Sequence, residues 1–144
     1  MDQRPLMLEM KLTTRAWDEY IRRLADEADL PDTYRPTLMF VARCPGVSQK
    51  AIAEHNRVTS ASVSQTVRDM IAEGYLYREA DSDDLRSSHL FLTEKGKAAD
   101  ERIRDKVKAA ELTVSDALTP GEIEETFRIL RRVQKVLGAG DGKK

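Results

Sequence analysis

The fold is decided by residues 48–96, which read SQKAIAEHNRVTSASVSQTVRDMIAEGYLYREADSDDLRSSHLFLTEKG. Ser48 opens a short helix of about two turns that closes near Asn56. Thr59 or Ser60 then suits the N-cap of a second helix, because a short hydroxyl side chain can accept a hydrogen bond from a free backbone N–H. Two short helices joined by a tight turn predict a helix-turn-helix.

The second helix of this pair has one apolar side and one polar side. Its inward positions follow the spacing i, i+4, i+7 and i+8 and are Val63, Val67, Met70 and Ile71, after which Gly74 ends the helix. The other side presents Ser60, Ser62, Ser64, Gln65 and Arg68. Hydroxyls, an amide and a guanidinium are the groups that pair with base edges and phosphates, so this side is suited to contact a DNA groove. The alternative, that the serine-rich first turn only caps the helix, stays open.

Beyond Gly74 the apolar pattern changes from helical to alternating. Residues 75–78 and 89–93 alternate on either side of the polar stretch 81–88, which predicts a hairpin with a long exposed tip. A helix-turn-helix followed by a hairpin is the layout of a winged helix-turn-helix, in which the second helix enters the major groove. The predicted fold class is therefore mainly α with a small β-hairpin, a winged helix-turn-helix flanked by long N- and C-terminal helices.

Long amphipathic helices are predicted on both sides of this segment. The first covers residues 8–30 and ends at Pro31, and an apolar helix over 36–43 follows it. Thr93 caps a helix that extends to about Leu118, and the next helix begins with a capping box that places proline at its first position. The apolar stripe of that last helix includes Ile123, Phe127, Leu130 and Leu137.

At 144 residues the chain has the length of one ordinary domain, and we predict a single domain over 1–144. Within it, 34–93 forms the winged helix-turn-helix lobe, and 138–144 forms a flexible tail. The helices at 8–30 and 94–137 are predicted to mediate dimerisation, because their apolar stripes need a cover that a second copy of the chain can supply. The alternative is that these stripes pack only within one chain.

Composition excludes several classes of protein. The formal net charge of −1 gives no overall attraction to nucleic acid, so any DNA binding must come from a local arrangement. No stretch approaches the roughly 20 apolar residues that span a bilayer, which predicts a cytoplasmic protein without a membrane partner. Cys44 is the only cysteine, and we expect it to be buried packing rather than a redox sensor.

No cofactor or catalytic centre is expected. His55 and His89 lie on different elements without a metal-ligand spacing, so no metal site is predicted. The sequence contains no nucleophile elbow and no glycine-rich phosphate loop. The chain is therefore not expected to be an enzyme.

The segment from Ser48 to Leu76 resembles the helix-turn-helix of MarR-type regulators, and the hairpin strengthens the resemblance. The family's wing has an aspartate, an arginine two residues later, and a hydrophobic-x-Leu-Thr-x-x-Gly tail. Here these positions are Asp84, Arg86, and the run from Leu90 through Thr93 to Gly96. An acidic residue also matches upstream, at Asp81.

The resemblance implies a transcription regulator that binds double-stranded DNA and is sequence-specific. Arg86, held by the carboxylate of Asp84, would insert into the minor groove, where a narrow width concentrates negative potential. The alternative is a surface ion pair of little energetic value. The predicted DNA-binding residues are Ser48, Gln49, Lys50, Ser60, Ser62, Ser64, Gln65, Arg68, Asp84 and Arg86.

The chain departs from the family at two positions of the second helix. Family members often carry a basic residue where this chain has Asp69, and an arginine or similar residue where it has Gln65. Phosphate contacts are therefore expected to be fewer, although Lys50, Arg57 and Arg68 could compensate.

The resemblance also implies a homodimer that binds a pseudo-palindromic operator, with half-sites about one helical turn apart. The predicted interface residues are Leu6, Leu8, Leu12, Ile123, Phe127 and Leu130. Family members often bind small aromatic effectors between the dimer helices and the DNA-binding lobes, which suggests a ligand-responsive repressor. Trp17, Tyr20, Tyr34 and Phe40 are candidate pocket residues, although aromatic residues at helical spacing are more often plain core. The alternative function is a winged-helix module that contacts only proteins.

Overall fold

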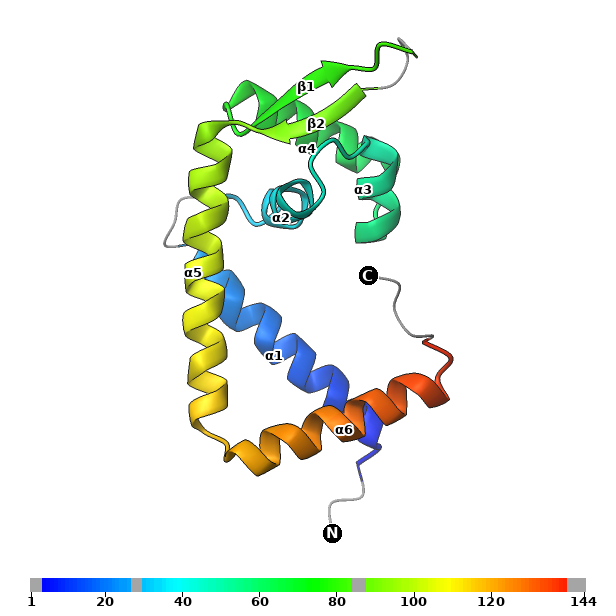
Figure 1. Ribbon diagram of the computed structural model, residues 1–144, viewed down its shortest axis with the longest axis vertical. Coiled ribbons are helices and arrows are strands. Elements are labelled where there is room, and N and C mark those ends of the chain that lie inside the picture. Colours follow the sequence, from blue (N-terminus) through cyan, green and yellow to red (C-terminus); the bar gives the residue numbers. More distant parts are fainter. Residues whose placement is uncertain (1–3, 27–29, 84–87, 140–144) are drawn as a thin grey trace. The chain divides into compact units, whose positions relative to one another are not determined.

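The computed structural model describes residues 4–26, 30–83 and 88–139 (Figure 1). Six helices and one two-stranded antiparallel sheet make up these parts of the chain, which confirms the predicted class and the winged helix-turn-helix order. The elements are α1 (Leu6–Asp26), α2 (Arg35–Arg43), α3 (Gln49–Asn56), α4 (Ser60–Ala72), β1 (Leu76–Ala80), β2 (Ser88–Leu92), α5 (Glu94–Asp116) and α6 (Pro120–Val136).

The chain divides into two compact units, Met1–Val107 and Lys108–Lys144. The boundary falls inside α5, which is one continuous helix. The prediction of one domain over 1–144, with its dimerisation helices and flexible tail, stays a prediction.

Hydroxyl side chains begin four of the helices, as the sequence predicts. The Ser48 hydroxyl accepts a hydrogen bond from Ala51 N–H at 3.2 Å, and Thr59 accepts one from Ser62 N–H at 3.1 Å. The Thr93 hydroxyl accepts from Gly96 N–H at 3.0 Å at the start of α5. Thr119 and Glu122 form the predicted capping box of α6. Each cap satisfies a backbone donor that the helix leaves free, which stabilises a helix by about 1 kcal/mol.

The β1–β2 hairpin is joined to the turn between α2 and α3. Its register pairs Leu76 with Leu92 and Ala80 with Ser88. Gly46 N–H donates to the Leu90 carbonyl at 2.8 Å, and Leu90 N–H donates to the Val47 carbonyl at 3.0 Å. The middle of β2 is therefore fixed to the residues that lead into the helix-turn-helix.

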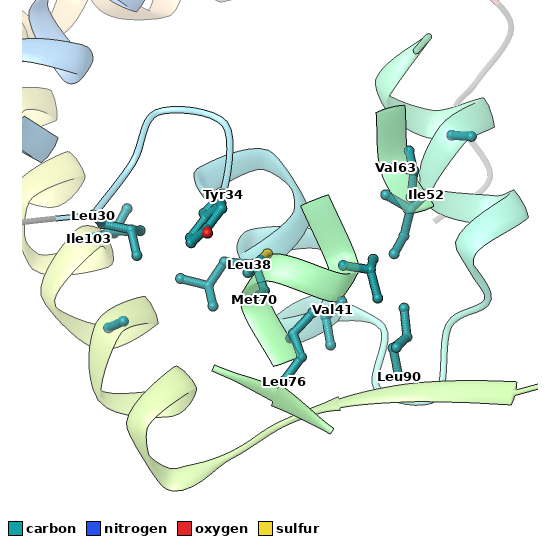
Figure 2. Close-up of a cluster of buried hydrophobic side chains, with 13 residues drawn as sticks. Leu30, Tyr34, Leu38, Val41, Ile52, Val63, Met70, Leu76, Leu90 and Ile103 are labelled. Carbon is teal, nitrogen blue, oxygen red and sulfur yellow. The ribbon is translucent and has the colours of Figure 1, made fainter. Parts of the chain in front are cut away.

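A single hydrophobic core lies beneath α2, α3, α4 and the hairpin (Figure 2). Full burial of a Leu, Val or Met side chain contributes about 1.5 to 3 kcal/mol, so this core is the main stabilising feature of the winged lobe, residues 34–93. Leu30, Ala99 and Ile103 extend the core beyond the lobe. The lobe's own buried side chains include Leu38, Val41, Ile52, Val63, Val67, Met70, Leu76 and Leu90.

Three predictions about local structure are wrong. The first helix was expected to reach Leu30, but Leu30 is not helical, because it packs into the core of the winged lobe. Strand β1 does not alternate, since only Leu76 is buried and the residues after it are exposed. Cys44 is not buried, because it is the C-cap of α2 and lies at the surface.

The unit Lys108–Lys144 has a different surface from the winged lobe. Helix α6 contains no buried residue. Between residues 108 and 139 the exposed large apolar side chains are Leu112, Val114, Leu118, Phe127, Ile129, Val136 and Leu137.

Candidate nucleic-acid interface

The outward side of α4 carries the side chains that the sequence predicts for it. Ser60, Ser62, Gln65 and Arg68 are exposed, and Ser64 is half-buried. On the opposite side, Val63, Val67 and Met70 are buried and Ile71 is half-buried, as expected for a helix that packs on one face only. The lobe's core therefore holds this polar face in a fixed orientation.

Three side chains of this face form a chain of hydrogen bonds. Arg68 Nη2 donates to Gln65 Oε1 at 2.9 Å, and Gln65 Nε2 donates to Asp69 Oδ1 at 2.8 Å. The carboxylate and the guanidinium thus fix which end of the Gln65 amide donates and which accepts. One N–H and one lone pair of the amide remain for an external partner. Sequence reasoning treated Asp69 as a departure that weakens binding, and it missed this orienting contact.

The start of α3 and the turn after it add groups of another kind. Ser48 and Lys50 are exposed, and Gln49 is half-buried. Arg57, the C-cap of α3, is exposed and has the left-handed backbone conformation φ 54, ψ 46. Within the described parts of the chain it is the only non-glycine residue with positive φ. Such a conformation costs a side-chain-bearing residue about 1 to 2 kcal/mol.

The loop end of the hairpin contains contacts that the sequence did not indicate. His89 Nδ1 lies 2.8 Å from the Gly46 carbonyl oxygen, and His89 Nε2 lies 3.2 Å from Asp81 Oδ2. The other oxygen of Asp81 accepts a hydrogen bond from Asp83 N–H at 2.9 Å. No local signal could have found the His89–Gly46 pair, because its members are 43 residues apart in the chain.

These two acceptors favour the charged imidazolium. The Gly46 carbonyl, followed by the Asp81 carboxylate, raises the pKa of His89 above its usual value, against a smaller opposing effect of burial. The predicted wing-tip residues Asp84 and Arg86 lie outside the described residues.

The predicted effector residues occupy different environments. Tyr34 is buried in the core edge-on to Tyr75, with ring centroids 6.0 Å apart. A hydrogen bond to the Glu73 carboxylate, followed by burial, raises the pKa of Tyr34 to about 12. Phe40 stacks on the ring of His55 at 4.2 Å. Trp17 is half-buried and Tyr20 exposed on α1, so the four rings do not line one described cavity.

A cavity of about 280 Å³ lies elsewhere in the unit Met1–Val107. Its lining includes Tyr77 and Phe91, whose rings stack at 5.4 Å, and the buried carboxylate of Asp100. Burial raises the pKa of Asp100, while Arg104, whose Nε lies 2.9 Å from Asp100 Oδ2, opposes that shift. Sequence reasoning did not single out any of these residues as a site.

The predicted interface residues are largely accessible. Leu6, Leu8, Leu12 and Phe127 are exposed, and Ile123 and Leu130 are half-buried. None of the helices in the described parts is long and apolar enough to cross a membrane. The same parts hold no cluster of three or more side chains suited to a metal ion.

The chain is similar to known sequences. The family model described as "MarR family" matches residues 28–87. An uncharacterized HTH-type transcriptional regulator of Bacillus subtilis strain 168, YybA, is 23% identical over 130 residues, which cover 90% of this chain and 87% of that protein.

Solved structures share the fold at low sequence identity. MepR, a transcription regulator of the Staphylococcus aureus multidrug efflux pump MepA, is 19% identical with a TM-score of 0.79, over 93% of this chain and 99% of its own. FabT of Streptococcus pneumoniae, solved in complex with DNA, is 20% identical with a TM-score of 0.77, over 92% of this chain and 96% of its own.

Proposed function

We propose that the chain is a MarR-type transcription regulator that binds double-stranded DNA as a homodimer, and the match of residues 28–87 to the MarR family model supports this. The operator is pseudo-palindromic, because a two-fold dimer presents two α4 helices related by symmetry. The protein acts as a ligand-responsive repressor in the cytoplasm. FabT, which shares the fold, was solved in complex with DNA, and this supports the choice of partner.

The observation that carries the proposal is the polar outer face of α4, backed by a closed core and set beside the hairpin (Figure 1). In this arrangement Ser60, Ser62 and Ser64 allow a close approach to the groove. Arg68 reaches a phosphate or a guanine, and Gln65 pairs with a base through the free half of its amide. Specific pairing needs a fixed amide, which the contact with Asp69 supplies.

Contacts with the DNA backbone come from the elements around α4. Ser48, Gln49 and Lys50 lie at the start of α3, where backbone N–H groups and a positive helix end favour a phosphate. Asp84 and Arg86 complete the proposed interface by placing a guanidinium in the minor groove.

The homodimer is supported by the apolar side chains that α1, α5 and α6 leave exposed. Leu6, Leu8 and Leu12 of α1 and Ile123, Phe127 and Leu130 of α6 are the proposed interface. Several large apolar side chains exposed on one helix, as α1 and α6 each have, are typical of a protein interface.

The proposed effector is a small aromatic molecule, and the proposed pocket residues remain Trp17, Tyr20, Tyr34 and Phe40. Because Tyr34 is buried in the lobe's core, an effector that contacts it would have to displace core packing. Such a displacement would disturb α4, which shares that core, and would lower DNA affinity.

The test begins with selection of bound fragments from the source genome, followed by affinity measurements on the selected duplex. Arg68→Ala should weaken binding by about 1 to 3 kcal/mol and reduce the slope of log affinity against log salt by about 1 if Arg68 contacts a phosphate. Arg132→Ala, an exposed arginine of α6, is the matched control and should leave affinity unchanged. Equal affinity of wild type and Arg68→Ala, or binding that is independent of salt, would contradict the proposal.

The second candidate function is a winged-helix module that contacts only proteins. The acidic residues Asp81 and Asp83 beside the wing favour it, because they repel phosphate. Salt separates the two candidates, since a protein contact made mainly by apolar surface lacks the steep dependence that counterion release gives to DNA binding.

A further inference from the structure

We propose that His89 is a positioning residue for the wing, acting as an imidazolium that ties the loop end of the hairpin to the turn leading into α3. Its two ring nitrogens face acceptors on two different segments, the Gly46 carbonyl at 2.8 Å and Asp81 Oδ2 at 3.2 Å. The first segment precedes the N-cap of α3, and the second follows the last residue of β1. One ring therefore connects the helix-turn-helix to the wing.

The partners of the ring require a specific protonation state. A carbonyl oxygen and a carboxylate oxygen only accept hydrogen bonds, so both contacts are satisfied only when both ring nitrogens carry hydrogen. Neutral imidazole has one N–H, and it would leave a lone pair facing either the carbonyl or the carboxylate. Loss of the proton therefore breaks one of the two contacts.

The Asp81 carboxylate extends this connection into the wing loop. Its Oδ1 accepts a hydrogen bond from Asp83 N–H at 2.9 Å, while its Oδ2 faces His89. The same carboxylate therefore fixes both the ring and the first turn of the loop. When the His89 contact is lost, the loop keeps its turn but loses this side-chain link to Gly46, while the backbone bonds of Leu90 to Gly46 and Val47 remain.

The neighbouring carboxylates act in the same direction. Glu79 is the register partner of His89 across the hairpin, and with Asp81 it favours the charged ring. In the α2–α3 turn, the Gly46 carbonyl faces the His89 ring. Cys44 is the titratable side chain of that turn. Arg78, on the neighbouring strand, lies 3.5 Å from the Ser88 hydroxyl. The combined effect raises the pKa of His89, so the contacts are complete at low pH and are lost as pH rises through the raised value.

The consequence for DNA rests on the proposed function. His89 holds the strands of the hairpin in one position relative to α4, so two neighbouring grooves can be contacted together. We expect DNA affinity to fall severalfold, beyond the general effect of pH, when His89 loses its proton. His55, the only other histidine of the sequence, provides the internal control.

The first measurement needs no DNA. NMR titration of the His89 ring, assigned with the help of His55→Gln, should give a midpoint above the usual value for histidine. Asp81→Asn keeps an acceptor for Asp83 N–H but removes the charge, and it should lower the His89 midpoint. A His89 midpoint that does not respond to Asp81→Asn overturns the proposal.

The second measurement is affinity for a mixed-sequence DNA duplex at constant salt, below and above the His89 midpoint. Wild type and His55→Gln should both lose affinity as pH rises, whereas His89→Gln should be weaker at low pH and show no such step. The His89 side chain is 41% exposed, so His89→Gln is expected to fold, which thermal unfolding checks. A step that persists in His89→Gln overturns the proposal. Failure of the wild type to bind duplex at any pH overturns the proposed function instead, and the NMR titration then decides the role of His89.

Discussion

The winged lobe buries most of its large apolar side chains, whereas the unit Lys108–Lys144 leaves several of them exposed. Among the residues described in 34–93, only Val58 and Tyr77 are large apolar side chains that lie exposed, and Leu38, Ile52, Val67, Met70 and Leu90 have no accessible surface. Residues 108–139 expose seven large apolar side chains, and α6 buries none of its residues. Both regions consist of well-capped amphipathic elements, so local sequence signals do not account for the difference.

The difference shows which region can bury its apolar faces within one chain. The helix-turn-helix and the hairpin bury their apolar faces against each other, which makes the lobe a closed core. Helix α6 has an apolar stripe at helical spacing and leaves it at the surface. A second copy of the chain is the cover that we propose for it.

Substitution of Gly96 should have the largest effect, because it tests how tightly the lobe is closed. A Cβ atom at Gly96 would clash with the Tyr75 carbonyl oxygen, a backbone atom that cannot move independently. Gly96→Ala should therefore lower the free energy of unfolding by about 3 kcal/mol, measured by urea unfolding at fixed protein concentration.

Gly121 provides the matched control in the other region. A Cβ atom there has no neighbour within 4 Å. Gly121→Ala should raise the free energy of unfolding by about 0.5 to 1 kcal/mol, because alanine loses less backbone entropy than glycine in a helix. Equal effects of the two substitutions would contradict the distinction between a closed lobe and an open helix.

Phe127 tests whether a second copy covers α6. Its side chain is 54% exposed and lies 5.7 Å from the guanidinium of Arg131, measured to the ring centre. Phe127→Gln should weaken the dimer by about 2 kcal/mol, or roughly 30-fold in dissociation constant, because aromatic residues often dominate interface energy. Sedimentation over a dilution series measures this, with the exposed Glu124→Gln as control. A dissociation constant unchanged by Phe127→Gln would place the interface elsewhere.

Arg57 should show the smallest effect on stability and tests strain within the closed lobe. Glycine would adopt the positive φ of Arg57 at no steric cost, but it would also give the unfolded chain more conformational freedom. Arg57→Gly should therefore raise the free energy of unfolding by at most about 1 kcal/mol. If Arg57 contacts a phosphate, the same variant should bind DNA more weakly and with a smaller salt dependence. A less stable variant would show that the Arg57 side chain supports the fold.

The parts of the fold that were predictable from sequence depend on signals within a few residues. Thr59, Thr93 and the Thr119 capping box gave helix starts, and the periodicity of α4 gave its buried side correctly at Val63, Val67 and Met70. These features need no information about distant segments.

The parts that were not predictable depend on contacts between distant segments or on the final packing. Leu30 is not part of the first helix, because its side chain packs in the core of the lobe. Cys44 is exposed because α2 ends there. The His89–Gly46 contact spans most of the lobe's sequence. The bond between Gln65 and Asp69 is local, but the sequence alone does not say whether Asp69 faces the amide or the solvent.

Thr93 combines several of these roles in one hydroxyl. Its oxygen accepts from Gly96 N–H and donates toward the carbonyls of Gly74 and Tyr75, so it contacts the end of α4, the start of the hairpin and the first turn of α5. Valine has nearly the same shape but would leave the Gly96 N–H and the Gly74 carbonyl without this partner, whereas the Tyr75 carbonyl would keep the backbone N–H of residue 93. In related sequences this position should therefore be replaced by serine more readily than by any residue of equal volume. The hydroxyl group, and not the size of the side chain, is what the position requires.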